Sequence, residues 1–342
     1  MSWTSVPAFL FEQGAKLRGA MYDAEWFASQ DAGCPIISVG NITAGGTGKT
    51  PFSIWLLYRL QERGIRSGFV SRGYKSGSTD VRAVTSVDPA LFGDEPALVR
   101  KEFPTIPVYI GGDRVKAARS LLASAKVDCI IADDAFQHRR MRRDLDIVIL
   151  DALEPAENYE FLPKGLARED FSALKRAQFV VISKANLASK EQLAFLEDKL
   201  RGFQLKKLRM LYKTAGFRRG EDFAPQLSGK LFLVSGVGRP ESVERMVSGV
   251  AKHKIFRDHH AYTETDAKEI VNEFEKSGAD HLITTAKDAV KLNQFTEFEK
   301  KAWTLQLGIT VEGDVDELDR KTDQLARTRA GVGFGASAAK NP

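Results

Sequence analysis

Short apolar runs rich in β-branched residues alternate along this chain with longer segments whose apolar residues recur at helical spacing. In the first two thirds of the chain the strand-like runs are 35–40, 67–71, 81–85, 105–110, 127–132, 146–151 and 178–183. Segments 52–63 and 114–125 between them have the helical period. Runs that are apolar throughout and are joined by helical crossovers predict an α/β fold, with a mostly parallel sheet covered by helices on both faces.

A second series of strand-like runs follows. It consists of 230–238, 253–258 and 280–288, again separated by helical patterns. We therefore expect a smaller second α/β domain, joined to the first by a short two-stranded connection in which 208–214 pairs with 302–313. The predicted boundaries are 1–212 for the first domain, 213–318 for the second, and 319–342 for a disordered tail, because the chain ends in small and polar residues.

The chain begins with an amphipathic helical pattern over about 6–27. Its apolar side chains could lie on a bilayer or pack on the protein's own core, and the sequence leaves both open. The charges of this segment sum to −1, counting Glu12, Lys16, Arg18, Asp23 and Glu25, so it lacks the positive charge that would attract it to anionic lipid. We expect no signal peptide and no membrane span, and therefore a soluble or peripheral protein.

The composition of the chain excludes few classes of function. The chain has 342 residues and a net charge of +5, which suits anionic ligands but is too mild to indicate nucleic-acid binding. Its cysteines, Cys34 and Cys129, form no CxxC pair, so a disulfide framework or a zinc site is not expected.

The strongest motif is a glycine-rich loop between a strand and a helix. The segment IISVGNITAGGTGKTPF places Gly45, Gly46 and Gly48 before Lys49 and Thr50. Glycines let successive N–H groups converge on phosphate oxygens, the helix N-terminus attracts the same anion, and the lysine and threonine reach the outer phosphates and a magnesium ion. The strict pattern has glycine where this chain has Thr43. We nevertheless predict an ATP- and Mg²⁺-binding P-loop of an NTPase-like fold. Its residues are Thr43, Ala44, Gly45, Gly46, Thr47, Gly48, Lys49 and Thr50.

A second acidic element follows the strand 127–132. Asp133 and Asp134 stand where P-loop proteins keep a magnesium-binding carboxylate, and neighbouring side chains at a strand end face opposite ways. An acidic turn without function is the alternative reading. Next come Gln137 and His138, which could face the same cleft. The arginines at 139, 140, 142 and 143 could bind an acceptor's phosphate or an anionic membrane surface, or form an ordinary solvated face.

Several further blocks complete a specific resemblance. In order along the chain they read SVGNITAGGTGKTP, SRGY, GDEP, DDAFQHRRMRRDLDIV, LPKGLARE, DHHAYT and TTAKDAVKL. Together, from about Ser38 to Leu292, they resemble the tetraacyldisaccharide 4'-kinase family. The resemblance implies transfer of phosphate from ATP to the 4'-hydroxyl of a lipid A disaccharide 1-phosphate. This would take place at the cytoplasmic face of a bacterial inner membrane, with no nucleic acid and no required protein partner.

The resemblance also implies residue roles. Lys49 would contact the ATP phosphates, Arg114 and Arg168 would lie around those phosphates, and Gln137 would be a polar residue of the nucleotide cleft. Magnesium would be held by Thr50, Asp133, Asp134 and Glu169. Asp94 of GDEP would be the catalytic carboxylate, paired with a histidine of DHH. We favour His259 over His260 because it directly follows Asp258. Without the resemblance, Asp94 would read as a helix start and the histidines as a polar loop.

The sequence is also compatible with two other functions. The chain could be a P-loop kinase for a soluble small molecule, or an NTPase switch that acts on a partner protein. Against a guanine-specific switch, SKAN at 183–186 is only a loose echo of an NKxD motif.

Overall fold

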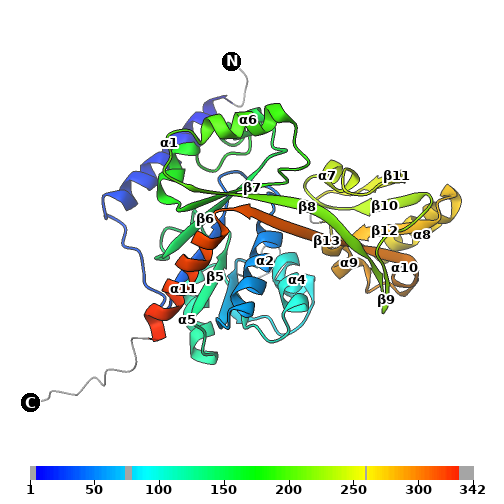
Figure 1. Cartoon of the computed structure of the whole chain (residues 1–342), viewed down its shortest axis with the longest axis horizontal. Coiled ribbons are helices and arrows are strands. Elements are labelled where there is room, and N and C mark those ends of the chain that lie inside the picture. The colour runs from blue at the N-terminus through cyan, green and yellow to red at the C-terminus, as the bar shows by residue number, and fades with distance from the viewer. Residues whose placement is uncertain (1–4, 74–78, 259, 331–342) are drawn as a thin grey trace, which may run out of the picture.

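The computed structural model describes residues 5–73, 79–258 and 260–330. Its strands are joined in one sheet, in the order β11-β10-β12-β13-β8-β7-β6-β1-β5-β2-β4-β3, with β9 beside β8 (Figure 1). The strands are β1 (Ile36–Gly40), β2 (Ser67–Ser71), β3 (Arg82–Ala83), β4 (Val108–Ile110), β5 (Cys129–Asp133), β6 (Leu145–Asp151), β7 (Phe179–Ser183), β8 (Lys206–Arg219), β9 (Asp222–Ala224), β10 (Leu231–Ser235), β11 (Val250–Ile255), β12 (His281–Thr285) and β13 (Ala302–Gly313).

Helices cover both faces of this sheet. They are α1 (Ser5–Asp23), α2 (Lys49–Glu62), α3 (Pro89–Phe92), α4 (Asp94–Glu102), α5 (Arg114–Ser124), α6 (Lys190–Lys199), α7 (Pro240–Glu244), α8 (Glu264–Ser277), α9 (Ala286–Leu292), α10 (Thr296–Lys301) and α11 (Val315–Ala330), with 3₁₀ turns η1 (Ala156–Tyr159) and η2 (Phe171–Arg176). Along β1, Ile37 packs in the same apolar cluster as Phe52 of α2, whereas Ile36 packs with Val115 of α5. This alternation is what a strand buried on both faces requires, and it confirms the predicted fold class.

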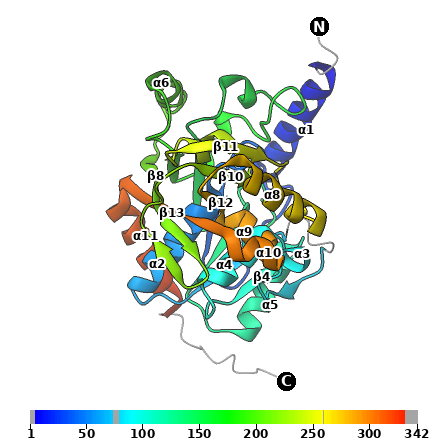
Figure 2. The ribbon, with the colours of Figure 1, turned by 90° about the vertical axis from the view of Figure 1, so that its right-hand side faces the viewer.

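The sheet has two parts. The first lobe, as we call it, is built on β1 to β7 and its strands are parallel except for β3. The second lobe carries β10, β11 and β12 with α7 to α10, and it lies in front of the first lobe in Figure 2. The long strands β8 and β13 run antiparallel through both lobes, and Gly313 pairs with Leu208 while Thr304 pairs with Arg218. The predicted pairing of 208–214 with 302–313 is therefore confirmed, whereas the domain boundaries stay a prediction.

The C-terminal segment differs from its expectation. Instead of a disordered tail from 319, the structure has helix α11 up to Ala330, and 331–342 lie outside the described residues. Leu318 is fully buried in the apolar cluster of the first lobe. Asp319 forms ion pairs with Arg59 of α2 and with Arg63, the residue directly after that helix. The tail prediction was wrong here because Leu318, with Val315 and Leu325 packed against the same cluster, and the ion pairs of Asp319 hold α11 on the first lobe.

Candidate active site

The glycine-rich loop lies at the carboxyl edge of the sheet, between central strand β1 and helix α2. Gly45 and Gly48 have positive φ angles of 108° and 97°, which side chains disfavour. The Thr47 N–H donates to the Gly45 carbonyl oxygen over 3.1 Å, and the Asn41 amide donates to the Thr47 hydroxyl over 2.9 Å. The loop thus turns at Gly45 and Gly48 and leads directly into the first turn of α2 at Lys49.

Thr43 fits the loop without any glycine-like geometry. It is buried and pairs with Ala167, and the neighbouring Ala44 N–H donates to the Leu166 carbonyl over 2.7 Å. Among the described residues, positive φ angles outside glycine occur at Glu25, Asp134 and Lys184. Threonine at 43 is therefore tolerated because the chain runs there as a short bridge to another segment.

Gly48 has no room for a side chain. A Cβ atom there would lie 2.5 Å from the Tyr212 hydroxyl and 2.6 Å from the Ser183 hydroxyl, at a positive φ angle. We expect Gly48→Ala to weaken ATP binding by about 10- to 100-fold, because a non-glycine residue in this conformation costs about 1–3 kcal/mol. Isothermal titration with Mg-ATP measures this. Gly14→Ala, where a Cβ meets nothing within 4 Å, is the matched control, and an equal loss in both variants would contradict the assignment.

The two acidic residues at the end of β5 face different partners, as expected. Asp133 accepts a hydrogen bond from the Ser71 hydroxyl over 3.3 Å. Burial raises the pKa of Asp133 to about 7, and the nearby Lys49 partly counters this. Asp134 adopts a φ of 48° and its carboxylate lies 3.5 Å from the Lys49 ammonium. Burial opposes its ionisation, but Lys49 and Arg168 outweigh burial and hold the pKa of Asp134 well below its usual range.

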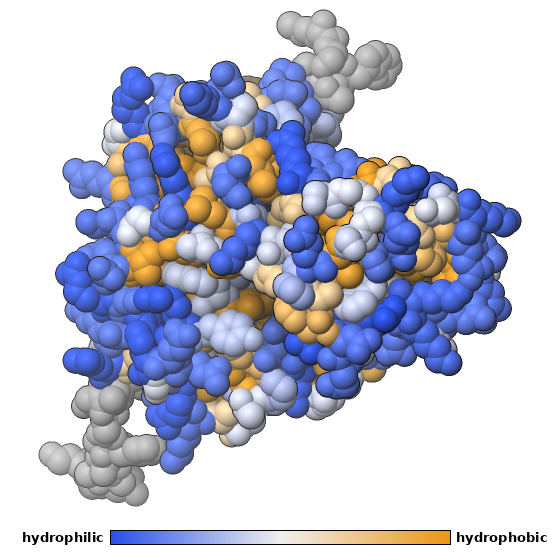
Figure 3. All heavy atoms as spheres, turned by 45° about the vertical axis from the view of Figure 1, so that its right-hand side comes forward, coloured by the Kyte–Doolittle hydropathy of each residue, from blue (hydrophilic) through white to orange (hydrophobic). Residues whose placement is uncertain are grey.

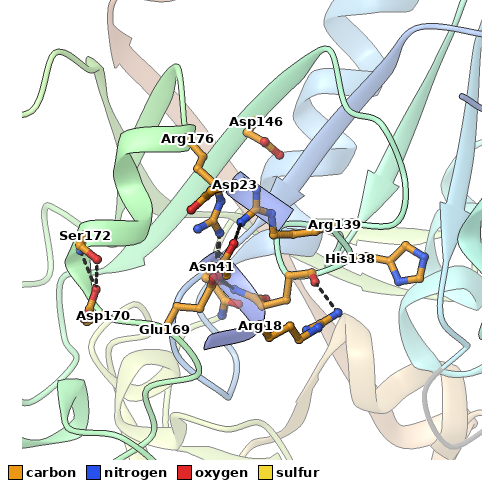
Figure 4. A network of polar contacts seen from close by, with 12 residues as sticks. Arg18, Asp23, Asn41, His138, Arg139, Asp146, Glu169, Asp170, Ser172 and Arg176 are labelled. Carbon is orange, nitrogen blue, oxygen red and sulfur yellow. Dashed lines mark hydrogen bonds and ion pairs between the residues drawn. The ribbon is translucent and has the colours of Figure 1, made fainter. Parts of the chain in front are cut away.

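Arg168 and Glu169 join this loop from the segment after η1. Arg168 makes two hydrogen bonds to Asp134, of 2.9 and 2.8 Å, and another to the Asn41 side chain. Glu169 accepts hydrogen bonds from Arg176 at 2.9 Å and from the Gln137 amide at 2.8 Å. Figure 4 shows Glu169, Arg176 and Asn41 close together. The same Gln137 amide donates to the Asn41 carbonyl over 2.8 Å. These predicted site residues therefore form one polar network with the loop.

Arg114 is a buried cation at the start of α5. Its Nη1 donates to the Gly112 carbonyl over 3.1 Å, and its buried Nε has no hydrogen-bond partner. Burial lowers the pKa of Arg114, and the charge of Asp134 partly offsets that effect. Burial, together with Arg114, also lowers the pKa of His138 to about 4, so its imidazole is neutral at physiological pH. A buried guanidinium with an unused donor is well suited to an anionic ligand.

Asp94 occupies the first turn of α4, at the boundary between the lobes. It is buried, and its carboxylate lies 3.2 Å from the ammonium of Lys291, which comes from α9 of the second lobe. The predicted partner His259 lies outside the described residues. The neighbouring His260 contacts Asp266 over 3.2 Å. The pairing of Asp94 with His259 stays a prediction.

Comparison with known proteins places the chain. The model of the tetraacyldisaccharide-1-P 4'-kinase family matches residues 2–326. A tetraacyldisaccharide 4'-kinase of Bdellovibrio bacteriovorus is 38% identical over 338 residues, covering 94% of this chain and 98% of the relative. The chain belongs to this kinase family. One from Anaeromyxobacter dehalogenans is 35% identical, covering 83% of this chain and 79% of the relative.

A solved structure of a kinase from the same family has the same fold. The crystal structure of LpxK from Aquifex aeolicus, described as a complex with ATP, matches with a TM-score of 0.73 and 24% identity. The match covers 93% of this chain and 96% of that chain. It supports the α/β architecture of the P-loop NTPase type over both lobes.

The arginines that follow Gln137 serve this kinase structurally. Arg139 donates to the Gly19 carbonyl over 2.9 Å and pairs with Asp23 over 2.7 Å, so it anchors the C-terminal end of α1 (Figure 4). The other three also meet acids, Arg140 with Asp113, Arg142 with Asp31 and Asp144, and Arg143 with Asp146. The reading of this run as a phosphate site receives no support from these contacts.

Two features of this kinase site lay beyond sequence reasoning. One is Lys291, which sits in the TTAKDAVKL block without a predicted role. The other is a buried ionic cluster beside the loop, formed by Asp151, Glu154, Lys184 and Arg239. Lys184 belongs to the SKAN segment, whose weak similarity to an NKxD motif is a sequence signal at this position. Its acidic partners lie elsewhere along the chain, and no local sequence pattern predicts that they contact it.

The side chains at this site suit a magnesium ion with few protein ligands better than a metal that is enclosed by several protein side chains. Among residues 5–73, 79–258 and 260–330, no three acidic, histidine or cysteine side chains gather as a metal cage. Asp134 and Glu169 are engaged by arginines, whereas the buried Oδ1 atom of Asp133 has no hydrogen-bond partner. Magnesium keeps several waters and takes one or two carboxylates together with substrate phosphates, and Asp133 with Thr50 would provide that.

Proposed function

We propose that this kinase transfers the γ-phosphoryl group of ATP to the 4'-hydroxyl of a lipid A disaccharide 1-phosphate precursor. The observation that carries the proposal is the cationic site around the P-loop. Lys49, Arg114 and Arg168 surround the acidic end of β5, in a chain that the family matches over nearly its whole length. Such an arrangement neutralises the charge of a phosphoryl group in transfer, which is where most of the catalysis in this reaction class lies.

The chemistry of the acceptor calls for a base. A bond forms between the sugar oxygen and the γ-phosphorus, the bond from that phosphorus to the oxygen of the leaving ADP breaks, and the hydroxyl proton passes to a protein group. We assign this group to Asp94, with His259 as its partner. Lys291 holds the Asp94 carboxylate from the second lobe, so the base is oriented across the boundary between the lobes. Magnesium, when bound by Asp133 and Thr50, would supply further charge neutralisation at the phosphates.

The purine is proposed to be adenine. A guanine-specific site needs a free carboxylate or amide after the SKAN lysine. The Asn186 amide instead donates to the Tyr212 carbonyl over 2.8 Å, and its oxygen accepts from the Tyr212 N–H over 2.9 Å. Both polar atoms of the Asn186 amide are thus bonded to the backbone of β8 and are not available to a guanine base. The SKAN segment therefore gives no support for a GTP-dependent switch.

Release of ADP, with and without acceptor, tests the function. We expect steady ADP production from Mg-ATP only when the tetraacylated disaccharide 1-phosphate is present. Glucosamine 1-phosphate tests the rival kinase for a soluble acceptor. Equal turnover without any acceptor would favour the NTPase switch, and turnover with the soluble sugar alone would favour the soluble-acceptor kinase.

Helix α1 is our candidate for contact with the membrane surface that holds such a lipid. No helix among the described residues is long and apolar enough to cross a bilayer. Yet α1 exposes a group of large apolar side chains, namely Val6, Phe9, Leu10, Phe11 and Leu17. Figure 3, which views the molecule obliquely from the second-lobe side, shows a mostly hydrophilic face with smaller apolar areas. The apolar face of α1, together with a lipidic acceptor, supports peripheral attachment at the cytoplasmic face of the inner membrane.

A double substitution on α1 tests the attachment. We expect Phe9→Ser with Leu10→Ser to weaken sedimentation with phosphatidylethanolamine–phosphatidylglycerol vesicles by about 10²–10⁴-fold, because two large apolar side chains each contribute about 1.5–3 kcal/mol on burial. The matched control is Val87→Ser with Leu91→Ser, which removes two other exposed apolar side chains. Unchanged vesicle binding of the α1 variant would remove this helix as the membrane contact.

A further inference from the structure

Lys184 connects the phosphate-binding loop to a buried carboxylate. It directly follows β7 and adopts a positive φ of 57°, which is unfavourable for a lysine. Its ammonium lies 2.6 Å from an oxygen of Asp151 and donates to the Gly46 carbonyl over 3.4 Å. Only 5% of the Lys184 side chain and none of the Asp151 side chain is exposed. The cation is therefore held between the end of β6 and the middle of the loop.

Arg239 brings the second lobe to the same carboxylate. It stands just before α7, and its Nε lies 3.0 Å from the Asp151 oxygen that Lys184 also binds. Its Nη2 pairs with Glu154, and its Nη1 donates to the Leu153 carbonyl over 3.0 Å. Each guanidinium nitrogen thus has a partner in the first lobe, so Arg239 links the second lobe to the first. The preceding Gly238 lies against the loop, since a Cβ on it would be 3.4 Å from the Gly46 nitrogen.

Stability alone is a poor explanation for such a cluster. Burial of charges costs about as much as their attraction returns, and apolar residues of similar volume often serve a fold equally well. The contact with the loop suggests a geometric role instead. The peptide unit between Gly46 and Thr47 is planar, so a cation that holds the Gly46 carbonyl also sets the direction of the Thr47 N–H. In the structure the Thr47 N–H donates to the Gly45 carbonyl, so the contact fixes the turn on which the other N–H groups of the loop, the expected donors to ATP phosphates, are arranged.

We propose that Lys184 is a positioning residue for the phosphate-binding loop, and that Asp151 and Arg239 make its hold on Gly46 depend on the placement of the second lobe. The proposal rests on ATP being the ligand of this loop, as in the proposed function. The position of the Gly46 carbonyl would then depend on the position of the second lobe, which carries Lys291.

Substitution of Lys184 separates positioning from stability. We expect Lys184→Met to raise the Kd for Mg-ATP about tenfold, with a matching rise in KM for ATP and little change in KM for the lipid, because one charge-assisted contact to the loop is lost. It should also lower the Tm, since Asp151 keeps only Arg239. The double variant Lys184→Met with Asp151→Asn should regain Tm but not ATP affinity. Arg239→Gln should raise the Kd for ATP by a smaller factor.

The readouts keep this proposal distinct from the proposed function. Lys254→Met, which removes a lysine paired with Glu269 and Glu273 in the second lobe, is the control and should leave ATP affinity unchanged. Wild-type affinity for ATP in Lys184→Met, or recovery of affinity along with Tm in the double variant, would overturn the positioning role. Wild-type protein that binds ATP but does not phosphorylate the lipid would sink the proposed function alone, and failure of the wild type to bind ATP would overturn both.

Discussion

Replacement of Lys49 by methionine is expected to lower kcat/KM for ATP by about 10²–10³-fold, the usual effect of removing one preorganised group that stabilises transition-state charge. In the structure its ammonium lies 3.5 Å from Asp134 at the end of β5. From there it can move to the phosphates of ATP when the nucleotide binds. Methionine keeps the apolar stem and removes only the charge, so α2 should start unchanged. Steady-state kinetics with varied ATP, with the Tm as a check on folding, measures the effect.

The control for this variant is Lys276→Met in the last turn of α8. That lysine is exposed and belongs to the second lobe, so its loss changes the net charge by the same amount away from the loop. A similar loss of kcat/KM in both variants would mean that overall charge, and not the ammonium at the loop, supports activity.

Asp94→Asn is expected to lower kcat by about 10²–10⁴-fold, the range that a general base contributes, while the Kd for Mg-ATP stays close to that of the wild type. Asparagine preserves the size of the side chain at the first turn of α4, but it cannot take the hydroxyl proton. It also loses the ion pair with Lys291 across the lobe boundary. Single-turnover kinetics and ATP titration together separate chemistry from binding.

Glu102→Gln, at the opposite end of the same helix, is the matched control. Its carboxylate accepts a hydrogen bond from Tyr58 at the surface, so kcat should not change. If Asp94→Asn lost ATP affinity and kcat to the same extent, Asp94 would be part of the nucleotide site and not the base.

The local pattern of the sequence accounts for most of the fold. Strands such as β1, β5 and β6 are buried along their whole length, and this is the kind of segment that apolar runs reveal most clearly. The pairing of β8 with β13 was also foreseeable, because the two strand-like runs flank the second lobe. Helix α11 was not, since its position depends on the ion pairs of Asp319 with Arg59 of α2 and with Arg63 directly after α2. Arg59 and Asp319 are 260 residues apart along the chain.

The candidate site likewise contains residues that the sequence predicts and residues that it does not. The loop from Gly45 to Thr50 and the acidic end of β5 have short motifs with direct physical meaning, and the structure brings Lys49 within ion-pair distance of Asp134. Arg168 and Glu169 could be named only through the family resemblance, because nothing in their own segment predicts that it folds back onto the loop. Lys184 and Arg239 needed the structure, since their common partner Asp151 is a strand-ending acid like many others.

Transfer of labelled phosphate from ATP to the lipid is the direct test of the proposed reaction. Wild-type protein, Mg²⁺, γ-labelled ATP and the tetraacylated disaccharide 1-phosphate should yield a lipid that carries one additional labelled phosphate, placed at the 4' position by NMR. Label that appears only as inorganic phosphate, or on another hydroxyl of the sugar, would contradict the account.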